Sequence, residues 1–511
     1  MLDRHEFVVQ GEVPSPFAAV VSALRSRFTV EEGAPRTVQR TWLDTFDWRL
    51  HRAGLTLEHR TDAGRTELTL SSTSGLRISD EPRGSTGPGR VDRLGADAIS
   101  GRLAPIVGAR ALLAVAESEG ALRDARLTNQ DDKTVVRVSV EDGFSDAALA
   151  PRVTLTPVRG YEREAKRARR LLASVPGFEP TSESQLDAAL AAVGRHAGDY
   201  TGKVDVSLDG SAPASAALAA VLLRVLGMLE ANVDGVVRDL DIEFLHDLRI
   251  SVRRTRSGLT LAGDSLPAGL AARYAGEFKW LGDLSTPVRD LDVYLLGLDA
   301  TIGESGDGEA LQPFRRYLAR RRRAERRRLL AGLRSRRFAA LTGDWRAALL
   351  DASDHPAADE PTAAALATTR ITRGYRRIVK RGSAITSASP AEDLHALRKR
   401  CKQLRYLMEY FASLHEPRAH HKIIKELKSL QDCLGRFQDS QIQREAITSL
   451  ADQMAAEQAV PAPTLLAMGK VSAGLESRQR DARGEFAGRF NRFANDKTAR
   501  MITALPVRAA S

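Results

Sequence analysis

The chain is poor in the residues on which several large classes of protein depend. Its 511 residues include only Cys401 and Cys433, and both fall at apolar positions of predicted helices, which excludes a disulfide framework. Although 43% of the residues are hydrophobic, no apolar run reaches about 18 residues, and the N-terminus has no signal-peptide core. We therefore expect a folded cytoplasmic protein that does not enter a membrane.

Motifs for nucleotides, nucleophilic catalysis and nucleic acids are also missing. The chain has no Gly-x-x-x-x-Gly-Lys-Ser/Thr loop and no Gly-x-Ser-x-Gly elbow. Aromatic residues make up 5% of the chain, which leaves few platforms on which single-stranded bases could stack. No helix-turn-helix, zinc-finger or RNP-type motif is present, so nucleic-acid binding is the least favoured function.

Positive charge, by contrast, is abundant and unevenly placed. Residues 1–200 hold 27 Lys and Arg against 28 Asp and Glu, whereas the whole chain holds 76 against 65. All of the excess therefore lies after residue 200, which predicts a polyanion as the partner of that part. The run from Arg320 to Arg328 adds seven arginines in nine residues; we expect it to be a solvated surface, and the alternative is that it widens the same basic region.

Two segments of this second part repeat each other 149 residues apart. The first reads His246-Asp-Leu-Arg249-Ile-Ser-Val-Arg253, and the second reads His395-Ala-Leu-Arg398-Lys-Arg-Cys-Lys402. Lys279 and Asp283 recur at the same offset as Lys428 and Asp432. A register kept over two motifs predicts a duplicated helical unit.

In each copy the cations share one side of a helix. Positions 0, +3, +7 and +10 fall within an arc of about 80°. The two resulting cation stripes are His246, Arg249, Arg253 and Arg256, and His395, Arg398, Lys402 and Arg405. A solvated face usually mixes charges of both signs, and that alternative stays open, but neither stripe contains an acid. Stripes of this kind suit phosphate, and Lys279, Lys425 and Lys428 extend the supply of cations on the following helix.

The first 200 residues follow a different pattern. Strand-like alternation occurs at 5–13, 38–43, 133–141 and 152–158, with a hairpin at 54–60 and 66–70 and helices at 15–28 and 161–174. Ser and Thr at alternate positions fit a barrel with one polar face. We expect an antiparallel β-barrel domain over 1–195, a linker over 196–214, and an all-α domain over 215–500 with repeats at about 215–350 and 362–500.

The second part resembles a CHAD domain, a helical module named for its histidines. The resemblance rests on His246-x-x-Arg249-x-x-x-Arg253 with Lys279-Trp-Leu-Gly-Asp283, and on the copies of both motifs. It implies a pseudo-twofold pair of helical bundles that binds inorganic polyphosphate in a basic central groove. The expected polyphosphate-binding residues are His246, Arg249, Arg253, Arg256, Lys279, His395, Arg398, Lys402, Arg405, Lys425 and Lys428.

The first part is similar to CYTH domains, which are triphosphate-tunnel barrels. The matching segments are Thr41-Trp-Leu-Asp-Thr45, Leu50-His-Arg-Ala-Gly54, Lys133-Thr-Val-Val-Arg137 and Pro157-Val-Arg-Gly-Tyr161. The family's Glu-x-Glu-x-Lys signature is replaced by His5-Glu6-Phe-Val-Val-Gln10-Gly-Glu12, and Thr69, Thr154 and Thr156 stand where the tunnel's lysine and acids are expected. Arg40, Arg60 and Arg137 could still line a tunnel. Without paired carboxylates a divalent metal would be held poorly, so we expect a tunnel without catalysis.

The leading hypothesis is therefore a cytoplasmic polyphosphate-binding protein, found with polyphosphate granules, that has no catalytic residues, no resident metal and no cofactor. The alternative is a metal-dependent triphosphatase or polyphosphatase in the N-terminal tunnel, which would need Mg²⁺ or Mn²⁺.

Overall fold

A computed structural model describes residues 4–82, 89–145, 149–305, 308–457, 460–503 and 505, with the side chains of 299–305 left out. The chain divides into two compact units, Met1–Gly202 and Lys203–Ser511. Each unit is described by itself below.

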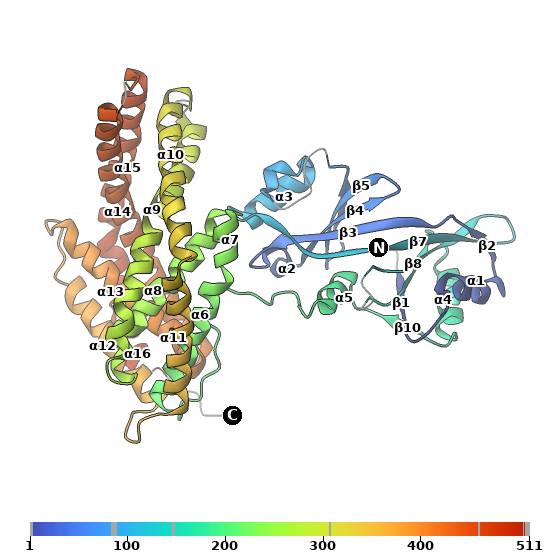
Figure 1. Cartoon of the computed structure of the whole chain (residues 1–511), viewed down its shortest axis with the longest axis horizontal. Helices are drawn as coiled ribbons and strands as arrows, with labels where there is room; N and C mark the ends of the chain where they lie inside the picture. Colours follow the sequence, from blue (N-terminus) through green and yellow to red (C-terminus); the bar gives the residue numbers. More distant parts are fainter. Residues whose placement is uncertain are drawn as a thin grey trace. The chain divides into compact units, whose positions relative to one another are not determined.

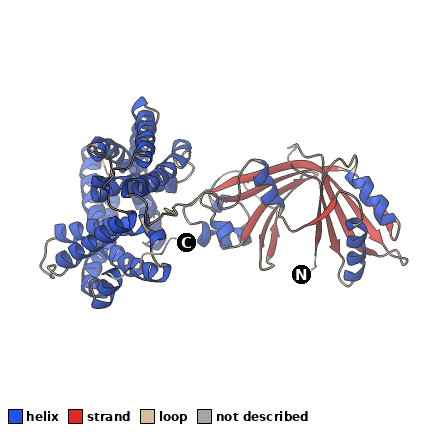
Figure 2. Ribbon diagram, turned by 90° about the horizontal axis from the view of Figure 1, so that it is seen from below, coloured by secondary structure: helices blue, strands red, loops and turns tan. Residues whose placement is uncertain are grey.

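The first unit is built on one ten-stranded antiparallel sheet, drawn in red in Figure 2. Its strands are β1 (His5–Val9), β2 (Thr29–Glu32), β3 (Arg36–Thr45), β4 (Leu55–Asp62), β5 (Arg65–Ser72), β6 (Arg77–Asp80), β7 (Leu112–Thr128), β8 (Thr134–Asp142), β9 (Arg152–Pro157) and β10 (Phe178–Thr181). The strand order is β10-β1-β9-β8-β7-β3-β4-β5-β6, and β2 pairs with β7. The expected hairpin is present, since β4 and β5 pair as antiparallel neighbours. Ala63 and Gly64, which connect them, adopt positive φ angles, as the tightest hairpin turns require.

The two faces of this sheet differ because its side chains alternate. Val138 on β8 and Leu155 on β9 are buried in an apolar core with α1 (Pro16–Arg25) and α4 (Glu162–Ala173). Leu57 and Leu70 belong to a second core with α3 (Asp97–Val107). The intervening polar residues line a cavity on the other face. Three short helices complete the unit: α2 (Arg49–Arg52), the 3₁₀ turn η1 (Val91–Arg93) and α5 (Gln185–Ala192).

The second unit is entirely helical in its described part, so the predicted order of an antiparallel β-domain and an all-α domain is confirmed. Its helices are α6 (Ala214–Ala231), α7 (Val233–Arg238), α8 (Ile242–Ala262), α9 (Leu270–Ser305), α10 (Gly308–Leu333), α11 (Arg336–Asp354), α12 (Ala363–Gly382), α13 (Ala391–Tyr410), α14 (Pro417–Glu457), α15 (Ala462–Phe493) and α16 (Asp496–Thr503), with 3₁₀ turns η2 (Gly263–Ser265) and η3 (Ala412–Leu414). The long helices α9, α10, α14 and α15 run side by side (Figure 1) and share one apolar core.

The duplication predicted from the sequence is present in the helices. The first residues of α6 and α12, Ala214 and Ala363, are 149 residues apart, as are those of α8 and α13. The two repeats are joined where they begin: the amide of Ala214 donates to the carbonyl of Pro361 at 3.0 Å, and that of Ala363 donates to Ala212 at 2.8 Å. Ser215 adds a hydroxyl bond of 2.7 Å to Glu360.

The segment Ala214–Arg238 is long and apolar enough to cross a membrane by length and composition alone. In this fold it serves as a core helix, because side chains such as Leu218, Leu222 and Leu229 are completely buried. Packing against α8 and α11 accounts for this burial.

Two prolines of this unit lie within helices, Pro287 inside α9 and Pro313 inside α10. Helix α9 continues to Ser305, and α10 starts at Gly308. Residues 306 and 307 lie outside the described part.

Candidate functional site

A cavity of about 370 Å³ in the helical unit lies between the two repeats. It is lined by residues of α8 and α9 from the first repeat and of α13 and α14 from the second. These residues are His246, Arg249, Arg253, Arg289, Asp290, Val293, Tyr294, Arg398, Lys402, Asp439, Ile442 and Gln443. We call this space the inter-repeat cavity. Five arginine or lysine side chains and two aspartates face it, so cations predominate.

The first wall of the cavity is the cation stripe of α8. Asp241 caps the start of this helix, where its carboxylate accepts from the amides of Glu243 and Phe244. Arg249 donates through Nη1 to the Thr286 hydroxyl at 2.8 Å and to the Gly282 carbonyl at 3.2 Å. These neutral acceptors hold the guanidinium in place without cancelling its charge.

The opposite wall is the matching stripe of α13. Arg398 donates to Asp439 at 3.1 Å and to Gln438 at 2.9 Å. The side chain of Lys402, one turn further along, makes no ion pair or hydrogen bond in the part of the chain that the structure describes. The inter-repeat cavity therefore contains Arg249, which is held by neutral acceptors, and Arg398, which is paired with a carboxylate. It also contains Lys402, whose side chain has no such partner among the described residues.

Burial and neighbouring cations lower the pKa of two side chains in the inter-repeat cavity. Burial and the neighbouring charge of Arg253 lower the pKa of Arg249 to about 10. Burial, together with the charges of Arg398 and Arg253, lowers the pKa of Lys402 to about 7. Because Arg253 belongs to the first repeat and Lys402 to the second, this effect acts across the boundary between repeats. An anion in the cavity would relieve both penalties.

Two of the arginines that line the inter-repeat cavity have a hydrogen-bond donor without an acceptor among the described residues. Nε of Arg253 and Nε of Arg398 are buried and have no hydrogen-bond partner among the described residues. A buried donor without an acceptor costs about 1–3 kcal/mol, so such groups usually have a ligand or solvent as partner. One of these donors comes from each repeat.

A buried contact fixes the two stripe helices against each other. Arg254 of α8 forms an ion pair of 2.9 Å with Glu409 of α13, and the Tyr410 hydroxyl donates to the Arg254 carbonyl at 2.5 Å. Glu409 also accepts from Arg405 at 3.1 Å. Arg405, a predicted binding residue, is therefore paired with a carboxylate on its own helix.

Five of the predicted binding residues line the inter-repeat cavity, and six do not. The six outside it are Arg256, Lys279, His395, Arg405, Lys425 and Lys428. Arg256, Lys279, Lys425 and Lys428 are exposed, and Lys279 pairs with Asp283 at 2.5 Å. The ring of His395 packs against that of Phe437, with centroids 6.0 Å apart. Lys279 and Lys428 each precede the cavity-lining aspartate of their helix by 11 residues, which is about 16 Å of helix.

Several residues that line the inter-repeat cavity were not predicted from the sequence. Arg289, Tyr294, Ile442 and Gln443 line the cavity but belong to neither stripe. Burial and the nearby Asp290 raise the pKa of Tyr294 to about 12. For Arg289 a signal existed, since it directly precedes Asp290, whose counterpart at the repeat offset of 149 residues is Asp439.

The arginine run of α10 meets the expectation of a solvated surface only in part. Four of its seven arginines are exposed, whereas Arg322 is mostly buried and pairs with Asp292 and Asp239. Arg326 donates to the carbonyl of Val237 at 2.8 Å. Exposed members such as Arg328 do occur, but part of the run holds α10 against α7 and α9.

The first unit contains a polar cavity of about 360 Å³ on one face of its sheet. The cavity is lined by Arg4, Glu6, Arg40, Trp42, Thr56, Glu58, Arg60, Glu67, Thr69, Ser71, Arg77, Leu122, Ser139, Glu141, Thr154, Thr156, Ser184, Gln185 and Leu186. Arg40 and Arg60 are there as predicted. Arg137 is exposed and does not line the cavity, which corrects that expectation.

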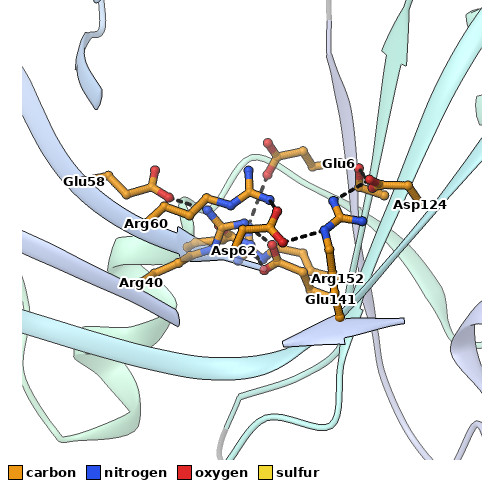
Figure 3. Close-up of polar contacts among 11 residues, drawn as sticks. Glu6, Arg40, Glu58, Arg60, Asp62, Asp124, Glu141 and Arg152 are labelled. Carbon is orange, nitrogen blue, oxygen red and sulfur yellow. Dashed lines mark hydrogen bonds and ion pairs between the residues drawn. The ribbon is translucent and has the colours of Figure 1, made fainter. Parts of the chain in front are cut away.

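Three of the four carboxylates that line this cavity, those of Glu6, Glu58 and Glu141, are engaged by arginines (Figure 3). Arg40 forms ion pairs with both Glu58 and Glu141, and Arg152 pairs with Glu6 at 3.3 Å. The amide of Gln185 donates to Glu141 at 2.7 Å. Among the described residues no group of three or more His, Cys, Asp or Glu is arranged to hold a metal ion. With Glu6, Glu58 and Glu141 already engaged by arginines, the donor set of this cavity is a poor fit for a divalent metal, and no metal-dependent step is derived from it.

One part of the chain matches a known protein family. Residues 220–448 match the family model of the CHAD domain. Uncharacterized protein Rv2226 of Mycobacterium tuberculosis H37Rv is 30% identical over 229 residues, and Uncharacterized protein MT2285 of strain CDC 1551 is 29% identical over 229 residues. Each alignment covers 43% of this chain and 42% of the relative, so it spans less than half the length of either relative.

Solved structures similar to this chain come from several organisms. The CHAD domain from the plant Ricinus communis has a TM-score of 0.45 at 23% identity and covers 60% of this chain and 97% of its own. PptA from Streptomyces chartreusis has a TM-score of 0.44 at 18% identity, with coverage of 55% and 100%. The putative adenylyl cyclase HpAC1 from Hippeastrum, described as having a dominant triphosphatase activity, has a TM-score of 0.28 at 15% identity and covers 38% and 97%.

Proposed function

We propose, from the premise that residues 220–448 form a CHAD domain, that the helical unit binds inorganic polyphosphate in the inter-repeat cavity. Association with polyphosphate granules in the cytoplasm is part of the same proposal. The observation that carries it is the convergence of Arg249 and Arg253 from one repeat with Arg398 and Lys402 from the other on one cavity. A chain of ionised phosphates needs many cations close together and no base-stacking surface.

Two further observations support a phosphate ligand. The unpartnered Nε donors of Arg253 and Arg398 would each gain an acceptor from a phosphate oxygen. Burial lowers the pKa of Lys402 most, and the charges of Arg398 and Arg253 lower it further, which shows that neighbouring cations act on this amine. A neutral ligand would bring no negative charge to these cations.

We expect the affinity for long-chain polyphosphate to fall steeply as salt rises from about 50 to about 500 mM, because each neutralised phosphate releases condensed counterions. Isothermal titration with polyphosphate of defined length, beside RNA and ATP at equal ionic strength, measures this. The Arg249→Ala/Arg253→Ala variant should give a shallower salt slope. A nearly flat salt response of the natural protein would contradict electrostatic binding.

The N-terminal cavity is not proposed as a triphosphatase site, because arginines engage three of its four carboxylates. We expect the purified protein to release phosphate from tripolyphosphate far more slowly than about 1 s⁻¹, the low end of ordinary enzyme turnover. The assay would follow phosphate release with Mg²⁺ or Mn²⁺ present. Turnover near that value, abolished by Glu141→Gln but unaffected by Lys402→Ala, would instead establish the alternative function.

A further inference from the structure

Lys402 differs from the other lysines of the helical unit in its surroundings. It is partly buried in the inter-repeat cavity, whereas Lys399 on the same helix is exposed, as are Lys425 and Lys428 on α14. The charged groups that line the cavity around it are His246, Arg249 and Arg253 of α8, Arg289 and Asp290 of α9, Arg398 of α13 and Asp439 of α14. Arg405 of α13 also acts on it electrostatically. The cations outnumber the carboxylates.

These surroundings make the amine of Lys402 a nucleophile at neutral pH. Burial and the charges of Arg398 and Arg253 lower the pKa of Lys402 to about 7, so about half of the molecules carry an unprotonated amine at that pH. An ordinary lysine, with a pKa near 10.4, is unprotonated to about one part in 2,500 at pH 7. Desolvation next to other cations is a known way to activate a lysine.

The same cations select the kind of electrophile that can approach. Arg253 and Arg398 each have a buried Nε without an acceptor among the described residues, and both line the cavity with Lys402. The cavity of about 370 Å³ has room for roughly twelve water molecules at about 30 Å³ each, which is ample for a small phosphorylated molecule. A phosphate group bound to these arginines would share the cavity with the amine.

We propose that Lys402 is a site of acylation by small acyl phosphates, whose phosphate group is held by the arginines of the inter-repeat cavity. The amine nitrogen attacks the acyl carbon and forms an amide bond, while the bond from that carbon to the phosphate oxygen breaks. The electron pair of that bond leaves with inorganic phosphate, and the proton lost by the amine passes to the phosphate or to water. No oxidant, reductant or metal is needed.

Acylation would regulate the cavity, and this part rests on the proposed function. An acylated Lys402 has no positive charge and occupies part of the cavity with its acyl group. We expect it to weaken polyphosphate binding, so that a cell rich in acyl phosphates would hold less polyphosphate on this protein.

The test uses acetyl phosphate on the full-length protein at pH 7, with peptide mass spectrometry to measure acetylation of each lysine over time. Lys402 should react at least about tenfold faster than Lys399, because far more of its amine is unprotonated. Inorganic phosphate or tripolyphosphate should protect Lys402 and leave the rates of Lys399, Lys425 and Lys428 unchanged. Acetic anhydride, which has no phosphate, should show a smaller preference for Lys402.

Two variants make the test specific. Arg253→Ala/Arg398→Ala should slow acetylation of Lys402 without changing that of Lys399, and thermal melting would show that the variant is folded. Lys402→Arg should bind polyphosphate before and after acetyl phosphate treatment with equal affinity. If Lys402 reacts no faster than Lys399, or if phosphate does not protect it, the proposal is wrong.

The outcomes separate this inference from the proposed function. Selective, phosphate-protected acetylation in a protein that does not bind polyphosphate would support the modification site and refute the proposed function. Polyphosphate binding with unselective acetylation would refute the modification site alone. Selective acetylation that leaves polyphosphate affinity unchanged would refute the regulatory part.

Discussion

Replacing both Arg249 and Arg253 by alanine should abolish most of the affinity for long polyphosphate chains, and so should replacing Arg398 and Lys402. We expect each pair to cost about 2–4 kcal/mol, which is roughly 30- to 1,000-fold in Kd. The reason is that both pairs face one cavity, so each half tethers the chain for the other. Titration with chains of defined length measures the effect.

The matched control is Lys399→Ala/Arg400→Ala, which removes two cations from exposed positions of α13 and leaves the cavity unchanged. It should reduce the affinity far less than Arg398→Ala/Lys402→Ala. Chains too short to reach both stripes should bind weakly to every variant. A halved stoichiometry with unchanged affinity in each double variant would show two independent sites in place of one.

Raising the pH from 7 to 9 should weaken polyphosphate binding by up to about tenfold per pH unit, because bound phosphate favours the charged form of Lys402. The pKa of Lys402 is lowered to about 7 in the free protein, so binding must take up a proton above that pH. Calorimetry in buffers of different ionisation enthalpy would count the proton taken up. The internal phosphates of a long chain stay ionised between pH 7 and pH 9, so they do not make the binding affinity depend on pH.

The stability of the free protein should move in the opposite direction. Between pH 7 and the ordinary lysine pKa of about 10.4 the unfolded chain holds a proton on Lys402 that the folded protein lacks. The free energy of unfolding therefore rises with pH in this window. Lys402→Arg should remove both slopes while keeping the charge, and a binding slope that persists in this variant would assign the proton to another group.

Periodicity was enough to predict the core of the candidate site. Cations three and seven residues apart lie on one side of any α-helix, and the repeat implied that two such stripes belong together. The structure places His246, Arg249 and Arg253 opposite Arg398 and Lys402, as this reasoning expected. Helix period alone does not say how long the cavity is, so it could not separate the residues that line the cavity from those further along each helix.

The elements that were missed have weak local signals. Strand β7 is the longest of the sheet, yet Leu112–Thr128 contains several Ala, Glu and Ser residues and Gly120, which have low strand propensity. Its stability comes from pairing with β3 and β8, which a single segment does not reveal. Similarly, Glu58 and Glu141 lie on different strands, so no local motif announced their shared contact with Arg40.

The prediction from the sequence also failed to foresee that some arginines are buried. A run of seven arginines suggested a solvated face, but Arg322 is covered because Asp239 and Asp292 lie where its guanidinium ends. Asp239 precedes it by 83 residues. Sequence composition cannot foresee a partner at that distance, although a buried arginine needs one.

The apolar core shared by α9, α10, α14 and α15 has a consequence for how the protein is made. It packs Leu291 and Phe314 of the first repeat together with Ile447 and Leu475 of the second, so its contacts join residues more than a hundred positions apart. Contacts of high sequence separation form slowly, because the loop must close before any burial is gained. During synthesis the first repeat leaves the ribosome before its packing partners exist. Its long helices would then expose apolar surface until α14 and α15 have been synthesised, and exposed apolar surface of this kind is what chaperones bind.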